Sequence, residues 1–210
     1  TFGSDPNAKV TKKSKSPLSF HPIALIFGLL SFVSYLVEGA VGDWSALYLF
    51  EDKGIVIEEA VMGVMLFNGT MCIGRLLGNR LGKHLTSKQV VVGGYLLGSI
   101  AMGLIVFLPG HASMYTYLLL GISLAMIVPN LFSAMGEQNV IPMTQAVATS
   151  TMLGYMGILM GPALIGFIAH GTSLTVAFIV LTTLLVVSAG IGKYAYHLMS
   201  KDCGLSEEQI

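Results

Sequence analysis

The sequence predicts an all-α membrane protein with six transmembrane helices. Of its 210 residues, 54% are hydrophobic and only 10% are charged, whereas soluble domains carry about 25% charged residues. Apolar stretches of about 20 residues, the length that a helix needs to cross the hydrocarbon core, recur along the chain. We place these six spans at residues 22–48, 59–81, 90–109, 113–136, 143–169 and 173–197.

The segments at the two ends have a different composition. Residues 1–20 are polar, rich in Pro, Ser and Lys, and lack apolar periodicity, so we interpret them as a flexible linker. The bundle is then expected over residues 21–200, and residues 201–210 form a polar tail. Because the chain starts with Thr and not Met, we expect it to be a fragment of something longer.

The distribution of basic residues predicts the topology. Lys and Arg concentrate in cytoplasmic loops of membrane proteins. With the N-terminus inside, ten of the eleven basic residues lie at or near the cytoplasmic face, and Lys53 alone lies outside. Both termini are therefore expected to be cytoplasmic, in the plasma membrane, which in a bacterium is the inner membrane. Six helices with this topology, preceded by a basic linker, are typical of the second half of a twelve-helix carrier built from three-helix repeats.

Glu38 is the most informative residue of the first span. It lies in the stretch YLVEGAVGDWSALY, roughly 24 Å from Pro22 at the helical rise of 1.5 Å per residue. A carboxylate in hydrocarbon is costly, so an acid within a span indicates a functional site. Positions three, four and seven residues apart share a helix face, and lipid cannot satisfy polar groups. The polar stripe expected to face protein or water consists of Ser31, Ser34, Tyr35, Glu38, Gly42 and Ser45.

Three roles for Glu38 remain open. It is a structural acid bonded to Ser34 or Tyr35, a group that exchanges a proton as a cavity opens to each side, or a direct hydrogen-bond partner of a polar solute. Asp43 and Trp44 fall off the stripe, near the external boundary, as expected for interfacial residues.

The fourth span carries a second polar stripe, at Ser123, Asn130, Ser133 and Glu137. In carriers with repeated three-helix units, the first helix of each unit lines the central cavity, and here the first and fourth spans hold those places. Asn68 of the second span either joins this pathway or bonds a neighbouring helix. The expected solute and proton pathway is Glu38, Ser34, Tyr35, Asn68, Asn130 and Ser133.

Small residues and prolines predict how the spans pack. Glycines at small-xxx-small spacing allow close approach of helix backbones. Pro129 and Pro162 each remove a backbone donor and are candidate flex points. The glycine pairs expected to pack are Gly74 with Gly78, Gly78 with Gly82, Gly94 with Gly98, and Gly157 with Gly161.

Several function classes find no support in the sequence. The five histidines all lie at span ends, away from nucleophiles or carboxylates at metal-ligand spacing. There is no glycine-rich phosphate loop, and the formal net charge of zero gives no sign of a nucleic-acid partner. We expect no enzyme activity, no metal and no cofactor.

A local motif links the chain to a known family. From Arg75, the run RLLGNRLGKH is similar to the loop motif of the major facilitator superfamily, and Arg80, Gly82 and Lys83 match it. Arg75 stands in place of the motif's first Gly and Asn79 in place of its Asp, a degenerate form found in the C-terminal half. The runs GISLAMIVPNLFSAMGE and GYMGILMGPALIGFIA resemble that family's tenth and eleventh helices.

A shorter likeness concerns the first span. The spacing of Tyr35, Glu38, Trp44 and Tyr48 resembles the seventh helix of the fucose-permease-like sugar/proton symporters.

The resemblance implies a C-terminal six-helix half that rocks against a missing N-terminal half. It also implies a cytoplasmic gate of ion pairs among Arg75, Arg80 and Glu137, although the loss of the Asp at Asn79 removes one charge. The alternative is that these three are solvated loop charges.

The function expected from the sequence is secondary active transport of a small polar solute, coupled to protons. A proton-driven exporter of amphipathic compounds is the alternative that the 12 methionines favour. A non-transporting receptor or scaffold is the third. The expected partners are the solute, protons, the lipid bilayer and the missing half.

Overall fold

The computed structural model describes residues 21–81, 85–138 and 140–203, and in these ranges every regular element is a helix. Side chains of residues 79–81, 202 and 203 are outside the description, as are the expected linker and residues 204–210. The last helix extends three residues past the expected end of the bundle. The helices are α1 (Pro22–Glu51), α2 (Ile57–Leu81), α3 (Ser87–Phe107), α4 (Gly110–Ala125), α5 (Ile127–Glu137), α6 (Met143–Gly171) and α7 (Leu174–Cys203).

These helices confirm the predicted membrane architecture. Six spans among the described residues are long and apolar enough to cross a membrane, with α4 and α5 together forming one of them, Gly110–Glu137. The sequence predicts where these helices begin to within a few residues, because capping residues and prolines near several of the starts favour a helix N-terminus. Pro22 opens α1 behind a His21 cap, and Thr86 forms a reciprocal capping box with Gln89 at the start of α3.

The two prolines act differently on their helices. Proline has no backbone N–H, and its ring crowds the carbonyl four residues earlier, which for Pro129 belongs to Ala125. The fourth span is interrupted at that point, with Met126 between α4 and α5. By contrast, Pro162 lies inside a continuous α6.

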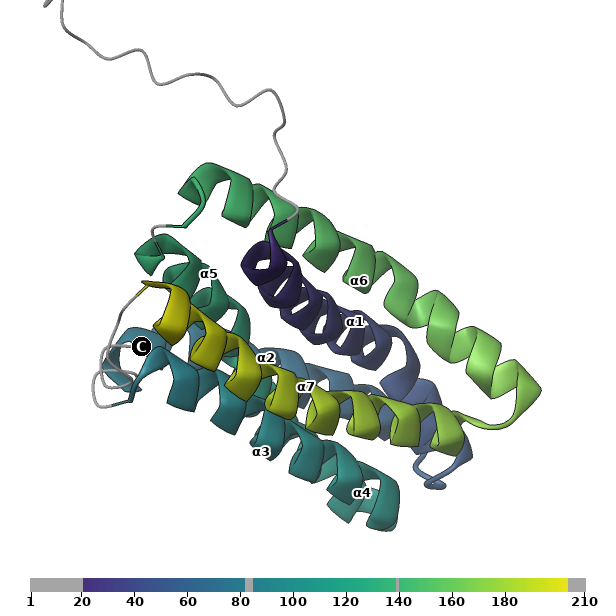
Figure 1. Ribbon diagram of the computed structural model, residues 1–210. Coiled ribbons are helices and arrows are strands. Elements are labelled where there is room, and N and C mark those ends of the chain that lie inside the picture. Colours follow the sequence, from purple (N-terminus) through teal and green to yellow (C-terminus); the bar gives the residue numbers. More distant parts are fainter. Residues whose placement is uncertain (1–20, 82–84, 139, 204–210) are drawn as a thin grey trace, which may run out of the picture.

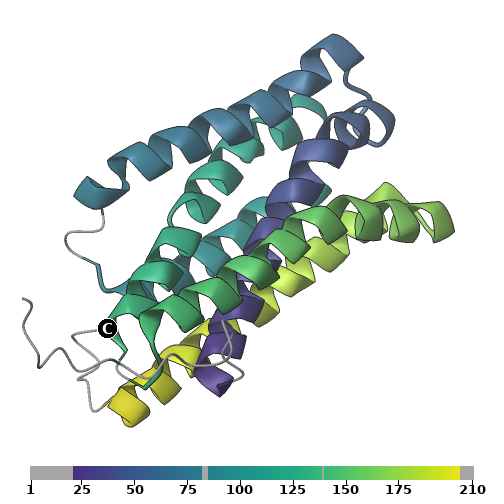
Figure 2. The same ribbon diagram turned by 90° about the horizontal axis from the view of Figure 1, so that it is seen from above.

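The packing pattern supports two three-helix repeats. Helix α1 packs most extensively against α6, α2 packs against α4, and α3 packs against α7. The first repeat is α1–α3 and the second is α4–α7. When the two are exchanged, α1 takes the place of α4–α5, α2 that of α6 and α3 that of α7. The α1–α6 pair then becomes the α2–α4 pair, and the α3–α7 pair becomes itself. Figure 1 shows α6 running along α1, with α3 and α4 on the far side of the bundle. Figure 2 shows the break between α4 and α5 and the separate course of α2.

Close backbone approach explains the spaced glycines. A Cβ at Gly157 would collide with the carbonyl oxygen of Phe32, and one at Gly161 with that of Leu36, so both glycines let α6 lie directly on α1. Gly94 does the same between α3 and α4, where a Cβ would lie 2.8 Å from the carbonyl oxygen of Ser123. The predicted packing role is confirmed at these positions.

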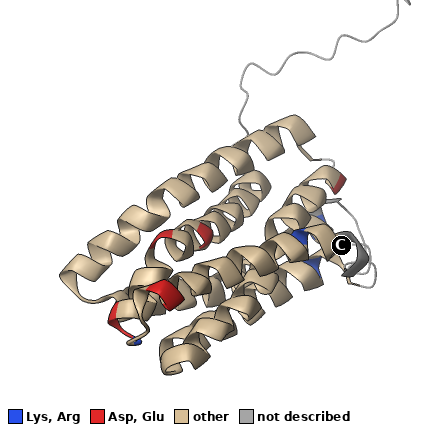
Figure 3. Ribbon diagram, turned by 180° about the vertical axis from the view of Figure 1, so that it is seen from behind, with Lys and Arg blue, Asp and Glu red and all other residues tan. Residues whose placement is uncertain are grey.

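The charges of the bundle separate toward its two ends. Figure 3 shows acidic residues gathered mainly at one end of the bundle and most basic residues toward the other, with some acidic colour midway along the helices. We call the end that carries Glu51, Asp52, Glu58 and Glu59 the acidic end. The opposite end, which holds Lys88, Lys193 and Lys201, is the basic end.

Candidate functional site

An ion pair between α1 and α2 is the centre of the candidate site. The guanidinium of Arg75 donates to Glu38, with Nη2 3.0 Å from Oε2 and 3.3 Å from Oε1. The sequence assigned Arg75 to the cytoplasmic gate, and the structure directs it to Glu38 instead. Its long side chain reaches from near the end of α2 to the middle of α1. Because the charges compensate each other, both can stay within the spans.

Two stacked tyrosines lie beside the ion pair. The ring of Tyr35, one turn before Glu38, stacks on Tyr155 of α6 at a centroid distance of 6.2 Å and an interplanar angle of 11°. Gly154 makes room for this ring, because a Cβ there would lie 2.6 Å from Cδ2 of Tyr35. We call Tyr35, Glu38, Arg75 and Tyr155 the Glu38 cluster. Sequence reasoning missed Tyr155, for which the adjacent Gly154 is the available signal.

The Glu38 cluster lies on an open side of the six-helix unit. The Glu38 side chain is 21% exposed and that of Arg75 is 43% exposed. Asn68 and Cys72 of α2, which precede Arg75 at helical spacing, are also exposed. The cluster therefore offers a charged acceptor, a charged donor and aromatic faces to whatever covers this side.

Ser34 belongs to the interior and not to the expected pathway. It is buried, and its hydroxyl donates to the Tyr95 oxygen at 2.7 Å, while the Tyr95 hydroxyl donates to the carbonyl of Leu30 at 2.7 Å. Ser31 and Ser45 are buried as well. The physical reason is that α6, α2 and α7 all contact α1, so only a narrow sector of its surface stays open.

The other predicted pathway residues are spread over α2 and α5. The Asn68 side chain is exposed and donates to the carbonyl of Val64 in its own helix at 3.0 Å. The Asn130 side chain donates at 2.8 Å to the carbonyl of Met126, which also accepts from the Asn130 backbone N–H at 3.2 Å, so the side chain adds a second hydrogen bond at the break between α4 and α5. Ser133 is exposed on α5. The structure does not gather these three residues into the Glu38 cluster.

A second contact of Asn130 involves three helices. The Ser87 hydroxyl of α3 donates to the backbone carbonyl of Asn130 at 3.1 Å, and the Tyr196 hydroxyl of α7 lies 3.0 Å from the Ser87 oxygen. Because Ser87 has a single hydrogen, Tyr196 is the donor in the second bond. One hydroxyl thus joins α3, α5 and α7 at the basic end.

The remaining gate residues stay a prediction. Glu137 is the last residue of α5 and is exposed. Arg80 lies in α2, and its side chain falls outside the described residues. No group of three metal-ligating side chains occurs among the residues that the structure describes.

Two contacts near the acidic end have roles that the sequence did not reveal. The indole of Trp44, expected at the lipid interface, donates to the carbonyl of Pro162 in α6 at 2.9 Å. Lys53 donates to the carbonyls of Val106 and Leu108 at 2.6 and 2.9 Å, joining the α1–α2 loop to the end of α3. Burial lowers the pKa of Lys53, and the charge of Asp52 offsets part of that shift.

Comparison with known proteins assigns the chain to a family. No family model matches it. It is 41% identical over 168 residues to an uncharacterised MFS-type transporter of Yersinia pestis, covering 79% of this chain and 43% of that protein. It is 30% identical over 170 residues to the membrane protein MosC of Rhizobium meliloti, covering 80% and 42%. The chain therefore spans less than half the length of these curated relatives.

A solved structure shows the same fold. The E. coli fucose:proton symporter FucP matches with a TM-score of 0.72 and 16% sequence identity, over 83% of this chain and 43% of FucP. The six-span architecture, the Yersinia relative and this fold agree with the motif that begins at Arg75. The chain is an integral membrane protein that belongs to the major facilitator superfamily and corresponds to the C-terminal six-helix half of its members.

Proposed function

We propose that this chain forms one half of a secondary active transporter that moves a small polar solute by alternating access, coupled to protons. The observation that carries the proposal is the Glu38–Arg75 ion pair, which lies within the spans on an open side of the bundle. Ionisable groups at such depth are costly and usually mark a solute or proton pathway. Transport is also what the name of the Yersinia relative states.

The Glu38 cluster has the groups that a hydroxylated solute needs. A carboxylate accepts hydrogen bonds and a guanidinium donates them, while the stacked rings of Tyr35 and Tyr155 offer flat apolar surfaces. A proton bound to Glu38 removes the charge that holds Arg75, which frees the guanidinium for the solute. Proton binding and solute binding are in this way linked through one contact.

The orientation and the partner half complete the proposal. The excess of Lys and Arg at the basic end favours a cytoplasmic location for that end and for both termini. A second six-helix half would cover the side on which the Glu38 cluster is exposed. The cavity between the two halves would then open alternately to each face.

Proteoliposomes that contain the full-length protein test the proposal. We expect an imposed inward proton gradient to drive accumulation of a labelled neutral monosaccharide, with fucose tested first because FucP transports it with protons. Glu38→Gln should lower gradient-driven accumulation at least about tenfold and retain solute exchange. Glu59→Gln, which alters an exposed acid paired with His111, is the matched control. Accumulation by Glu38→Gln at the wild-type rate would overturn the proposal.

A proton-driven exporter of amphipathic compounds is the second candidate. Met65 of α2 and Met152, Met156 and Met160 of α6 are exposed, and flexible thioether side chains adapt to varied apolar ligands. Efflux of ethidium from energised cells distinguishes the two candidates. Efflux that depends on Glu38, together with no monosaccharide uptake, would favour the exporter, and no movement of either probe would favour a receptor or scaffold.

A further inference from the structure

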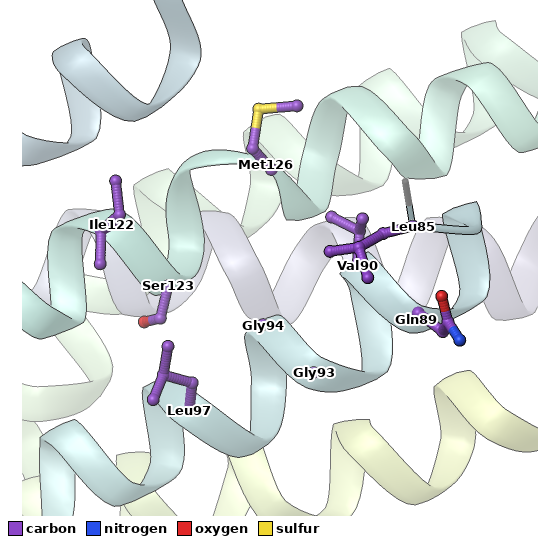
Figure 4. A pocket seen from close by; sticks show the side chains of 9 residues that line it. All are labelled: Leu85, Gln89, Val90, Gly93, Gly94, Leu97, Ile122, Ser123 and Met126. Carbon is purple, nitrogen blue, oxygen red and sulfur yellow. The ribbon is translucent and has the colours of Figure 1, made fainter. Parts of the chain in front are cut away.

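Two furrows run along α3 at the basic end, one on each side of the helix. The first, between α3 and the α4–α5 span, has a volume of about 330 Å³ and is lined by apolar side chains that include Val90, Leu97 and Met126. Figure 4 shows these side chains around the furrow, with Gly93 and Gly94 on the α3 ribbon between Val90 and Leu97. The second furrow, between α3 and α7, has a volume of about 570 Å³.

The second furrow combines charge with apolar surface. Lys88 of α3 and Lys193 of α7 line it together with Thr86, and Val92 and Leu96 continue it along α3. Both lysines belong to the basic end. Tyr194, the neighbour of Lys193, is 56% exposed, as expected of an aromatic residue at the depth of lipid headgroups.

The two furrows meet at Gln89 and Gly93, which line both of them. A Cβ at Gly93 would meet no atom of the chain within 4 Å, so the packing of α3 does not require a glycine there. The absence of a side chain instead leaves the ridge between the furrows low. One elongated ligand can therefore occupy both furrows at once.

We propose that this surface binds one anionic diacyl phospholipid from the leaflet at the basic end. Its phosphate lies between Lys88 and Lys193, and its two acyl chains lie in the two furrows on either side of Gly93. The surface and the lipid match chemically. The surface offers one pair of cations, Lys88 and Lys193, and two apolar furrows, and the lipid has one anionic headgroup and two acyl chains. Basic pockets between transmembrane helices are known to suit such headgroups.

The lipid site is separate from the transport pathway. The furrows involve α3, α4, the junction residue Met126 and α7, whereas the Glu38 cluster comes from α1, α2 and α6. Lipid binding can consequently be measured without a transported solute, and its outcome does not depend on the proposed function.

Native mass spectrometry of the purified full-length protein tests the charged half of the site. Phosphatidylglycerol should bind more tightly than phosphatidylcholine or phosphatidylethanolamine. Replacement of each lysine, Lys88→Gln and Lys193→Gln, should weaken phosphatidylglycerol binding about fivefold, the effect of one cation near an anionic headgroup. Lys201→Gln removes an exposed cation of α7 that lines neither furrow and should leave binding unchanged.

Gly93→Leu tests the apolar half, because its side chain would fill the junction of the furrows. It should weaken phosphatidylglycerol binding at least about fivefold, whereas Gly190→Leu, at a position on α7 that is equally open, should not. Equal binding by the lysine variants and wild type, or an equal loss in the control variants, would overturn the proposal. Competition by glycerol phosphate at the concentration of the lipid would also overturn it, since the headgroup alone would then suffice.

Discussion

At the scale of single residues, Glu38 and Arg75 depend on each other. Arg75→Gln leaves the partly buried carboxylate of Glu38 without its partner, so we expect the free energy of unfolding to fall by about 1–2 kcal/mol, between the effects seen for surface and buried pairs. The double variant Glu38→Gln/Arg75→Gln should recover most of this loss. A double-mutant cycle of unfolding in detergent micelles measures the coupling, and additive losses would contradict the pairing.

Tyr95 provides a second residue-scale prediction. Its hydroxyl accepts from Ser34 and donates to the carbonyl of Leu30 in the interior of the bundle. Tyr95→Phe removes this hydroxyl and leaves the Ser34 hydroxyl and the Leu30 carbonyl buried without it. We therefore expect the free energy of unfolding to fall by about 1–2 kcal/mol. Tyr115→Phe makes the same chemical change at a side chain that is 58% exposed and should have little effect. Similar losses in both variants would argue against the internal bond.

At the scale of elements, the contact between α1 and α6 depends on Gly157. A methyl group there meets the backbone carbonyl of Phe32, which cannot move without shifting the helix. Gly157→Ala should therefore destabilise the bundle by about 1–3 kcal/mol. Gly190→Ala, in open space on α7, should be neutral or slightly stabilising because alanine favours helix. Thermal unfolding of both variants decides whether α6 lies as closely on α1 as described.

The loop between α1 and α2 should respond to alkaline pH through Lys53. Burial lowers its pKa from the ordinary value of 10.5. Between the lowered native pKa and 10.5 the unfolded chain binds more protons, so the free energy of unfolding rises with pH in that window. The neutral amine keeps two N–H donors for the carbonyls of Val106 and Leu108. Unfolding curves from about pH 8 to about pH 11 should lose this rise in Lys53→Met and keep it in Lys201→Met.

At the scale of the whole molecule, the open side of the bundle should be wet. Cys72 is exposed on α2, one turn from Arg75. In a full-length protein with Cys72 as its single cysteine, we expect a charged, membrane-impermeant thiol reagent to modify it. Fucose, if transported, should slow the reaction. Modification by apolar reagents alone would mean that this side of α2 faces lipid, which would remove the basis for the transport pathway.

The sequence predicts the helices well and the site only in part, for a physical reason. Span length and composition follow from the thickness of the bilayer, and the glycines at Gly157 and Gly161 show which helix faces pack. The direction of an individual side chain depends on how many neighbours enclose its helix. Ser34 lies on the predicted stripe yet faces Tyr95, and Arg75 pairs with Glu38 although the resemblance implies that it belongs to the cytoplasmic gate. For Tyr155 the sequence offers the adjacent Gly154 as a signal, but its stacking on Tyr35 becomes clear once α6 is placed on α1.

The junction at Ser87 has a mechanical consequence for the bundle. Because the Ser87 hydroxyl bonds both the backbone carbonyl of Asn130 and the Tyr196 hydroxyl, we expect α3, α5 and α7 to move together at this corner. If the proposed alternating access widens the basic end, we expect the movement along the opposite flank, where α1, α2 and α6 carry the Glu38 cluster. The two furrows border this corner, so the proposed lipid would lie beside the helices that we expect to move together.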